Sequence, residues 1–353
     1  MAFTAINKPS VHFDCPIWDG SNSTTTVTGM GFKPDMLWMQ RYDGAGHPVI
    51  NNSTGGTAKS YICSGANAVD TTVMVASYTA DGFTLTGNIA NTNDASQKHV
   101  AACWKANGGT TTSNSDGSIT STVQADTTSG VSIIQWTGTG ANGTIGHGLG
   151  AAPKYIIAKA LGTAADGRAL NMGKTVSTAA DPETDAAVFC DEQAFSDDAT
   201  CWNDTAPTST VFSLGSNANT NASGQECIAY CFAEVQGFSK IGFYEGNGNA
   251  TRSTFVYCGF KPKWLLFKNR QATEDWAIKV SGLEGYGLGG ERTRTLKQAN
   301  PNNSTNCTVT FTAFGFRVTT TDGKANSENV EYSYLAFAER PMVGSNGIIS
   351  LAT

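Results

Sequence analysis

Charged side chains are scarce in this sequence of 353 residues. Asp, Glu, Lys and Arg make up 15% of the chain, against about 25% in a typical globular protein. The net charge is −6, and no run of Lys and Arg exceeds two residues. A protein that holds a phosphate backbone needs clustered basic side chains. We therefore do not expect nucleic acid as a partner.

Long hydrophobic runs are also missing. No stretch approaches the roughly 18 apolar residues of a membrane span, and the N-terminus lacks a charged segment followed by an apolar one. These absences predict a protein made in the cytosol, with no membrane insertion. The nine cysteines are odd in number and form no Cys-x-x-Cys pair, so we expect reduced thiols, with Cys103 and Cys231 as small buried residues of equivalent strands.

Motifs that carry chemistry are missing too. There is no Gly-x-Ser-x-Gly elbow, no phosphate-binding loop and no His-Glu-x-x-His pair. The four histidines are scattered and form no zinc pattern. Acidic residues gather between 181 and 198, where a solvated loop is the favoured interpretation and a hydrolase pair or a calcium site are the alternatives. The sequence predicts no enzyme, no cofactor and no metal.

The sequence is instead rich in Thr, Asn and Ser and contains 39 glycines. This mixture favours strands joined by tight turns over helices. A signature of Gly, Pro and an apolar run appears three times, at residues 31–39, 148–157 and 259–267. Its period is far longer than the 20–50 residues of solenoid repeats, so each copy should be a domain with its own core.

Other landmarks accompany each copy of the signature in the same order. An aromatic residue and a glycine turn come before it, at Trp18, Trp136 and Tyr244. After the signature, the sequence continues with a short alternating strand, an Asn-rich turn and a closing strand. The short strands are expected at residues 82–85, 211–214 and 315–318, and the closing strands at 100–104, 228–232 and 334–337.

These patterns predict an all-β protein of three tandem β-sandwich, jelly-roll-like domains that arose by internal triplication. The signature run should be a central strand covered on both faces, because it is continuously apolar. Trp38, Tyr155 and Trp264 should then be buried within their own domains. We place the domains at residues 1–107, 108–236 and 237–340, with a linker at 105–117 and a tail at 341–353. Domain one should be the least tightly coupled of the three.

Several of these segments resemble a group of poorly characterised bacteriophage virion proteins, many of them from marine phages. The resemblance rests on the opening Met-Ala-Phe-Thr, the repeated Gly-Phe-x-Pro signature and the ends of the strands at Trp104–Ala106 and Cys231–Glu234. Members of this group are described as tail-fibre or structural proteins. The resemblance thus implies a place on the virion surface after synthesis in the host cytoplasm, and it brings no map of functional residues.

Candidate contact residues lie both outside and within the shared landmarks. Trp202 and Trp276 are predicted to be exposed anchors of an interface, together with Tyr286 in the same insertion as Trp276. Asn93 and Asn221 lie in equivalent Asn-rich turns, where turn chemistry explains them and a contact with a glycan is the alternative. The copy-specific insertions around Asp197–Trp202 and Trp276–Arg294 are the expected contact regions.

The residue patterns and the resemblance lead to three candidate functions. The favoured one is a non-enzymatic virion surface protein, either decorating the capsid or associated with the tail, that docks on other virion proteins and forms a homo-oligomer. The alternative is a tail-fibre or receptor-binding adhesin that recognises host surface glycans. A polysaccharide depolymerase comes third. Heptads and collagen-like repeats, which are typical of long fibre shafts, do not occur in the sequence.

Overall fold

The computed structural model describes residues 4–44, 46–63, 66–171, 185–283, 292–295 and 303–341. The protein is all-β, with 46% strand and 4% helix, as the sequence predicted. Within these described residues, no helix is both long enough and apolar enough to cross a membrane.

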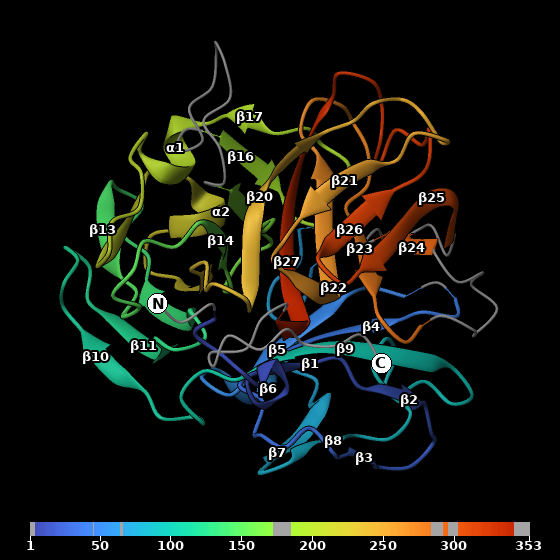
Figure 1. The fold of residues 1–353 in the computed structure, drawn as a ribbon. Coiled ribbons are helices and arrows are strands. Elements are labelled where there is room, and N and C mark those ends of the chain that lie inside the picture. Colours follow the sequence, from blue (N-terminus) through green and yellow to red (C-terminus); the bar gives the residue numbers. More distant parts are fainter. Residues whose placement is uncertain are drawn as a thin grey trace.

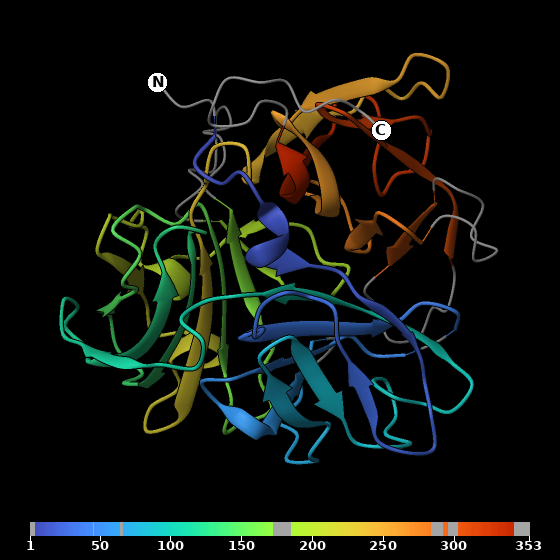
Figure 2. The same ribbon diagram turned by 60° about the horizontal axis from the view of Figure 1, so that its bottom comes forward.

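The strands form three units that occupy three sectors around a common centre (Figure 1). We define unit 1 as residues 13–104, unit 2 as residues 112–232 and unit 3 as residues 239–341. The sectors stay distinct when the molecule is turned (Figure 2). Each unit has a large sheet facing the centre, and in each the last strand lies between the signature strand and a strand that precedes the signature in the sequence.

Unit 1 has the large-sheet order β1-β9-β4-β5-β6, with β2 also pairing β9, and a small sheet β3-β8-β7. A short 3-10 helix, Pro9–Val11, precedes it. The strands are β1 Phe13–Asp14, β2 Ile17–Asp19, β3 Thr25–Val27, β4 Met36–Arg41, β5 Val49–Asn52, β6 Gly56–Ile62, β7 Val75–Thr79, β8 Gly82–Leu85 and β9 Lys98–Trp104.

Unit 2 has the large-sheet order β10-β11-β12-β19-β14-β15-β16-β17 and a small sheet β13-β18. Its elements are β10 Thr112–Asn114, β11 Ser121–Asp126, β12 Val131–Thr137, β13 Gly143–Gly146, β14 Tyr155–Ala160, β15 Arg168–Asn171, β16 Asp185–Val188, β17 Ser196–Asp197, α1 Ala199–Trp202, β18 Val211–Leu214, α2 Ala218–Asn221 and β19 Glu226–Phe232. Strand β10 lies inside the segment predicted to be a linker, which is a correction to that prediction.

Unit 3 has the order β20-β27-β22-β23-β24, which continues through β25 into β26 and β21. The last three strands fold back over the sheet. The strands are β20 Ser239–Glu245, β21 Thr254–Tyr257, β22 Phe260–Asn269, β23 Ala277–Val280, β24 Arg292–Thr295, β25 Asn303–Thr312, β26 Gly315–Val318 and β27 Glu331–Pro341. The three short alternating strands thus begin and end where the sequence predicted.

Each unit has its own core between its large and small sheets. In unit 1 this core includes Trp18 and Phe83, in unit 2 Trp136 and Phe212, and in unit 3 Phe316. Strands β8 and β26 bury every second side chain against the core, as a half-buried strand should. In β18 the apolar side chains of Phe212 and Leu214 also face the core, but Ser213 between them is buried as well. The sandwich layering inferred from the sequence is therefore present in all three units.

The inner faces of the three large sheets share a further core, which the sequence patterns did not predict. Trp104, Phe232 and Phe337 occupy equivalent positions of the closing strands and contact one another pairwise. The ring centroids are 5.8 Å apart for Trp104–Phe232, 5.5 Å for Trp104–Phe337 and 5.8 Å for Phe232–Phe337. The units therefore do not bury their apolar side chains independently, and the prediction of separate cores was wrong in this respect.

The signature strands lie in this shared core. Trp38, Tyr155 and Trp264 are buried as predicted, but Trp38 and Trp264 pack against rings of other units, whereas Tyr155 contacts Phe232 of its own unit. The rings of Trp38 and Trp264 lie 5.5 Å apart across two units. The strand register makes Met36, not Trp38, the equivalent of Tyr155 and Trp264, because Met36 lies opposite Trp104 as these two lie opposite Phe232 and Phe337.

Two of the three signature prolines come just before a strand, as predicted. Pro34 and Pro153 precede β4 and β14. Pro262 differs, since it lies within β22, at a point where the pairing with β27 shifts register. A bulge is one of the few places where a strand accommodates a residue without an N–H.

The N-terminal segment ties unit 1 to the other two units. His12 Nδ1 lies 3.0 Å from a carboxylate oxygen of Asp126 in unit 2, and Lys263 Nζ of unit 3 lies 3.2 Å from Asp14. Phe13 stacks on Phe337 with ring centroids 4.9 Å apart. Unit 1 thus makes ionic and aromatic contacts with both other units.

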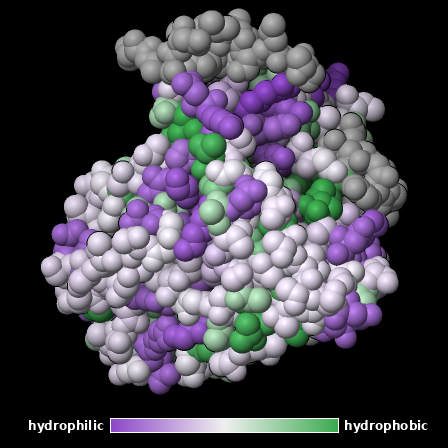
Figure 3. Space-filling view, turned by 90° about the horizontal axis from the view of Figure 1, so that it is seen from below, coloured by the Kyte–Doolittle hydropathy of each residue, from purple (hydrophilic) through white to green (hydrophobic). Residues whose placement is uncertain are grey.

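The surface reflects the composition. On the face seen in Figure 3, most residues are of intermediate hydropathy and the hydrophobic ones form small separate areas. Thr, Ser and Gly have this intermediate character, and they supply the surface that charged residues supply in most proteins.

Candidate functional site

The two tryptophans predicted to be exposed are buried. Trp202 ends helix α1 and is 1% exposed, within the core of unit 2. Trp276 is also 1% exposed, and its indole N–H donates to the carbonyl oxygen of Val188 at 3.0 Å. Its ring lies 5.3 Å from that of Phe189. Trp276 therefore anchors the seam between units 2 and 3, and neither residue is available to an outside partner.

The two predicted asparagines are also buried, with an exposed fraction of 0% each. Asn93 Oδ1 accepts from the backbone N–H of Ser21, and its Nδ2 donates to the carbonyl oxygens of Ser23 and Thr86. These bonds join the turn that precedes strand β3 of the small sheet to the loop that precedes the last strand, β9. A glycan contact through this side chain is excluded by its burial, and the interpretation as turn chemistry is the one that holds.

The same bonding pattern occurs in the other two units. Asn221 accepts from the N–H of Thr139 and donates to the carbonyls of Ala141 and Gly215. Asn326, which the sequence patterns did not reveal, accepts from the N–H of Asn247 and is buried as well. The third copy was hidden because its turn reads Lys-Ala-Asn instead of Asn-Thr-Asn. Tyr286 lies outside the described residues.

A glycine is needed next to each of these asparagines. A Cβ at Gly138 would collide with the carbonyl oxygen of Ala222, which follows Asn221 directly. A Cβ at Gly246 would collide in the same way with the carbonyl oxygen of Ser327. The close approach of two backbone segments therefore explains why a glycine follows the repeated aromatic residue in the sequence.

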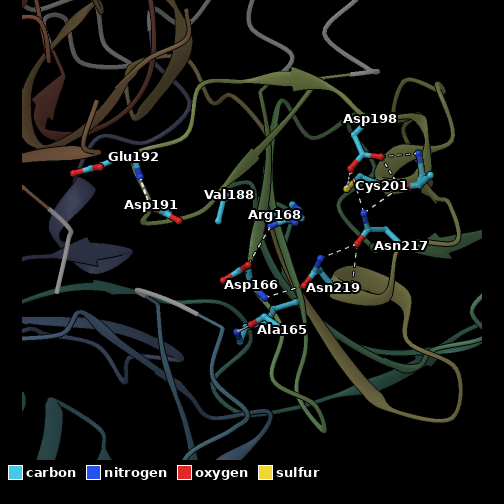
Figure 4. Close-up of polar contacts among 12 residues, drawn as sticks. Ala165, Asp166, Arg168, Val188, Asp191, Glu192, Asp198, Cys201, Asn217 and Asn219 are labelled. Atoms are coloured by element: carbon cyan, nitrogen blue, oxygen red, sulfur yellow. Dashed lines mark hydrogen bonds and ion pairs between the residues drawn. The ribbon is translucent and has the colours of Figure 1, made fainter. Parts of the chain in front are cut away.

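Of the acidic residues gathered at positions 181–198, Asp181 and Glu183 lie outside the described residues. Asp191 and Asp198 accept the hydrogen bonds drawn in Figure 4. Asp198 caps helix α1, accepting from the N–H of Thr200 at 3.0 Å, and also from the thiol of Cys201 and the amide of Asn217, each at 3.2 Å. Burial opposes ionisation of Asp198, but these hydrogen bonds outweigh it and lower its pKa. Among the described residues, no group of three or more His, Cys, Asp and Glu is placed to hold a metal ion.

A buried ion network crosses the seam between units 2 and 3. The guanidinium of Arg270 pairs with Asp185 of unit 2 and, at 3.2 Å, with Glu331 of its own unit. It also lies over the rings of Phe195 and Phe243, at 5.0 and 4.8 Å from their centroids. Because Asp185 is only 3% exposed, its role is to hold two units together.

A small cavity lies at the seam between units 1 and 2. It measures about 20 Å³ and is lined by residues that include Tyr61, Lys159 and Tyr230. Such a volume holds about one water molecule and no larger ligand. The two tyrosine hydroxyls are hydrogen-bonded to each other at 2.5 Å. Burial lowers the pKa of Lys159, whose ammonium donates to the carbonyl oxygen of Ala165.

The nine cysteines are all buried and have free thiols. Cys103 and Cys231 lie opposite Leu37 and Ile156 in equivalent strand pairs, which confirms their predicted equivalence. Burial raises the pKa of Cys227 and Cys258 to about 12 in each case. Thiols of this kind are packing residues and react poorly as nucleophiles.

The exposed candidate is an aromatic patch on the outer face of unit 3. We define this patch as Phe255, Tyr257, Phe314 and Arg317. The three aromatic side chains are 46%, 56% and 45% exposed, respectively. Arg317 lies opposite Phe255 in the pairing of β21 with β26, and its guanidinium carbon is 5.8 Å from the centroid of that ring. Tyr257 lies opposite Gly315, which has no side chain to cover it.

Units 1 and 2 build the same small sheet without aromatics on this face. In unit 1, Thr26 and Thr84 form the pair that corresponds to Phe255 and Arg317, and their hydroxyls lie 3.2 Å apart. In unit 2 the corresponding pair is Thr144 and Ser213. The sheet thus folds with small polar residues at these positions. The aromatic side chains of unit 3 are therefore not required by the sheet architecture that the three units share.

One known family model matches nearly the whole chain. The model of a domain of unknown function, DUF7483, matches residues 8–341. The chain belongs to the DUF7483 family. The DUF7483 match spans all three units, which agrees with a shared core that makes them one block. No curated protein and no solved structure matches the chain.

Proposed function

We propose that this DUF7483 protein is a non-enzymatic structural protein on the surface of a bacteriophage particle, where it docks through the faces of its β-sandwich units. The observation that carries the proposal is the contrast between the three units. All three are fixed around one aromatic core, but among the described residues it is unit 3 alone that carries large aromatic side chains exposed on its outer sheet. A rigid block with one distinctive face suits docking, because little conformational entropy is lost on binding.

Three further features support this proposal. Several sequence segments resemble those of phage virion proteins, which favours a position on the particle. The acidic residues that could have served a hydrolase, such as Asp185 and Asp198, are used in a seam and in a helix cap. Burial of apolar side chains on both faces of every large sheet also suits a protein that must survive outside the cell.

We also propose that the chain arose by triplication of one sandwich unit. The three large sheets share one central arrangement, in which the last strand lies between the signature strand and a strand that precedes it, and this supports a common origin. So do the equivalent buried asparagines, because Asn93, Asn221 and Asn326 make the same kinds of bonds at the same place in each unit. Chance convergence would have to reproduce both the topology and the turn chemistry.

The location is tested by imaging purified particles that have been labelled with antibody against this protein. We expect labelling of the capsid shell or of the tail, together with peptides of this chain in the mass spectrum of the particles. Particles that contain no such peptides would contradict the proposal. A protein that is missing from particles but binds host surface polysaccharide would support the adhesin function instead.

Self-association is also part of the proposal. A surface poor in charge loses little free energy of solvation when it is buried, because uncharged polar groups are easier to desolvate than ions. Light scattering on the purified protein should therefore give an integral multiple of the mass of one chain. A monodisperse monomer would contradict the predicted homo-oligomer.

A further inference from the structure

The aromatic patch of unit 3 has the composition of a protein-binding hot spot. Tyr, Phe and Arg are enriched at the centres of interfaces, where they supply most of the binding energy. Phe255 and Tyr257 project from the same side of strand β21, and Arg317 stacks on the first of them. Strand β21 is the last strand of its sheet, so the patch lies at a sheet edge that a large partner can reach.

The shape of the patch favours a protein over a small saccharide. A ligand pocket is concave and has several polar groups that converge on the ligand. This patch is instead the outer face of a short sheet, on which Gly315 and Thr310 flank the aromatic residues. Only Arg317 contributes a charge. A broad partner surface would cover all four side chains of the patch at once.

Charge narrows the choice of partner further. Within the part of the chain that the structure describes, Arg317 stacks on Phe255 and forms no ion pair with a carboxylate. Its guanidinium can therefore bind a carboxylate from outside in a bidentate manner. A second copy placed across a twofold axis on this patch would bring two guanidinium groups together with no carboxylate between them, which is unfavourable.

We infer that the patch binds a different protein of the particle, through a surface with an apolar centre and a carboxylate that meets Arg317. This inference rests on the proposed function, since it needs a particle on which to dock. It adds the position of the contact and the chemistry of the partner.

The test replaces patch residues with those that unit 1 has at the same positions. The variant Phe255→Thr/Arg317→Thr reproduces the pair Thr26 and Thr84, so the small sheet should still fold. Val73→Thr is the matched control, because Val73 is 42% exposed but lies in unit 1, outside the patch. Phage carrying each variant gene are purified, and the copies of this protein per particle are counted by quantitative mass spectrometry. Circular dichroism of the purified variants confirms that they are folded.

We expect at least a tenfold drop in copies per particle for the double variant, as for the loss of about 1.4 kcal/mol or more of binding energy, and no change for Val73→Thr. If the folded double variant is present in particles at the same copy number as the wild-type protein, the inferred role of the patch is wrong, but the proposed function still stands. Wild-type protein absent from particles would instead show that the proposed function itself is wrong.

A photo-crosslinking amino acid at position 257 identifies what lies against the patch. In intact particles, irradiation should join this chain to another particle protein, and the crosslinked peptide of that protein should lie near an Asp or Glu. A crosslink to a second copy of this chain would overturn the inferred partner. So would the absence of any protein crosslink in particles that contain the chain.

Discussion

Removing one aromatic ring from the shared core should destabilise all three units together. Trp104 is fully buried and its ring lies 5.1 to 5.8 Å from the rings of Phe13, Phe232, Trp264 and Phe337. Truncating a buried Trp to Ala costs about 3–5 kcal/mol, and the upper end of this range applies where several aromatic rings pack on the ring that is removed. Because these partners come from all three units, we expect Trp104→Ala to lose about 5 kcal/mol.

Scanning calorimetry measures this loss. For a chain of this length, the free energy of unfolding changes by about 0.7 kcal/mol per degree near the midpoint of thermal unfolding. The midpoint temperature should therefore fall by about 7 °C. The transition should stay single. The matched variant Trp104→Phe installs the residue found at the equivalent positions 232 and 337 and should lose no more than about 2 kcal/mol.

Two results would refute this reasoning. One is a Trp104→Ala variant that loses less than about 1 kcal/mol, as a substitution at the surface would. The other is a wild-type protein that unfolds in separate steps, of which the variant shifts only one. Either would mean that the central aromatic residues do not couple the units.

Three more predictions follow from buried polar groups. Asn221→Ala should cost about 2–4 kcal/mol in urea unfolding, because it leaves buried backbone groups unpaired, and a cost below about 0.5 kcal/mol would show that the turn does not depend on it. Arg270→Met should cost about 3–5 kcal/mol at pH 7, since it strands the carboxylates of Asp185 and Glu331 in the seam. A double variant that also carries Asp185→Leu should recover part of this loss, because one of the two stranded carboxylates is then gone, and no recovery would contradict the pairing with Asp185. Burial lowers the pKa of both His99 and His147 from 6.5. Because the unfolded chain then binds protons at a higher pH than the folded chain does, the free energy of unfolding should fall as the pH drops below about 6.5. A free energy of unfolding that stays constant between about pH 8 and pH 5 would contradict this.

The repeated strand pattern could be predicted from the sequence because it depends on local chemistry. Alternation placed the strand Gly82–Leu85 correctly, and the continuous apolar run at residues 264–267 correctly indicated burial on both faces. The repeated aromatic positions, such as Trp18, were correctly expected to be core. These signals report which side chains avoid water.

The same signals do not identify the residues that cover a buried side chain. The inner face of β4 is covered by residues more than a hundred positions away, such as Trp264, and nothing in its own sequence identifies them. Trp276 was misjudged for the same reason, since an insertion that fills a seam and one that reaches solvent have similar compositions. The patch was missed because Phe255 and Tyr257 fit an ordinary strand pattern. Only alignment with Thr26 in the first copy shows that aromatic residues are unusual there.

The most direct test of the shared core is to express residues 1–107 alone. The inner sheet face of this fragment would expose Trp38 and Trp104, which are 4% and 0% exposed in the full chain. We predict that the fragment aggregates or lacks a cooperative unfolding transition, as measured by circular dichroism and by the dispersion of its NMR spectrum. A soluble monomer with dispersed resonances and a sharp cooperative transition would contradict the shared core.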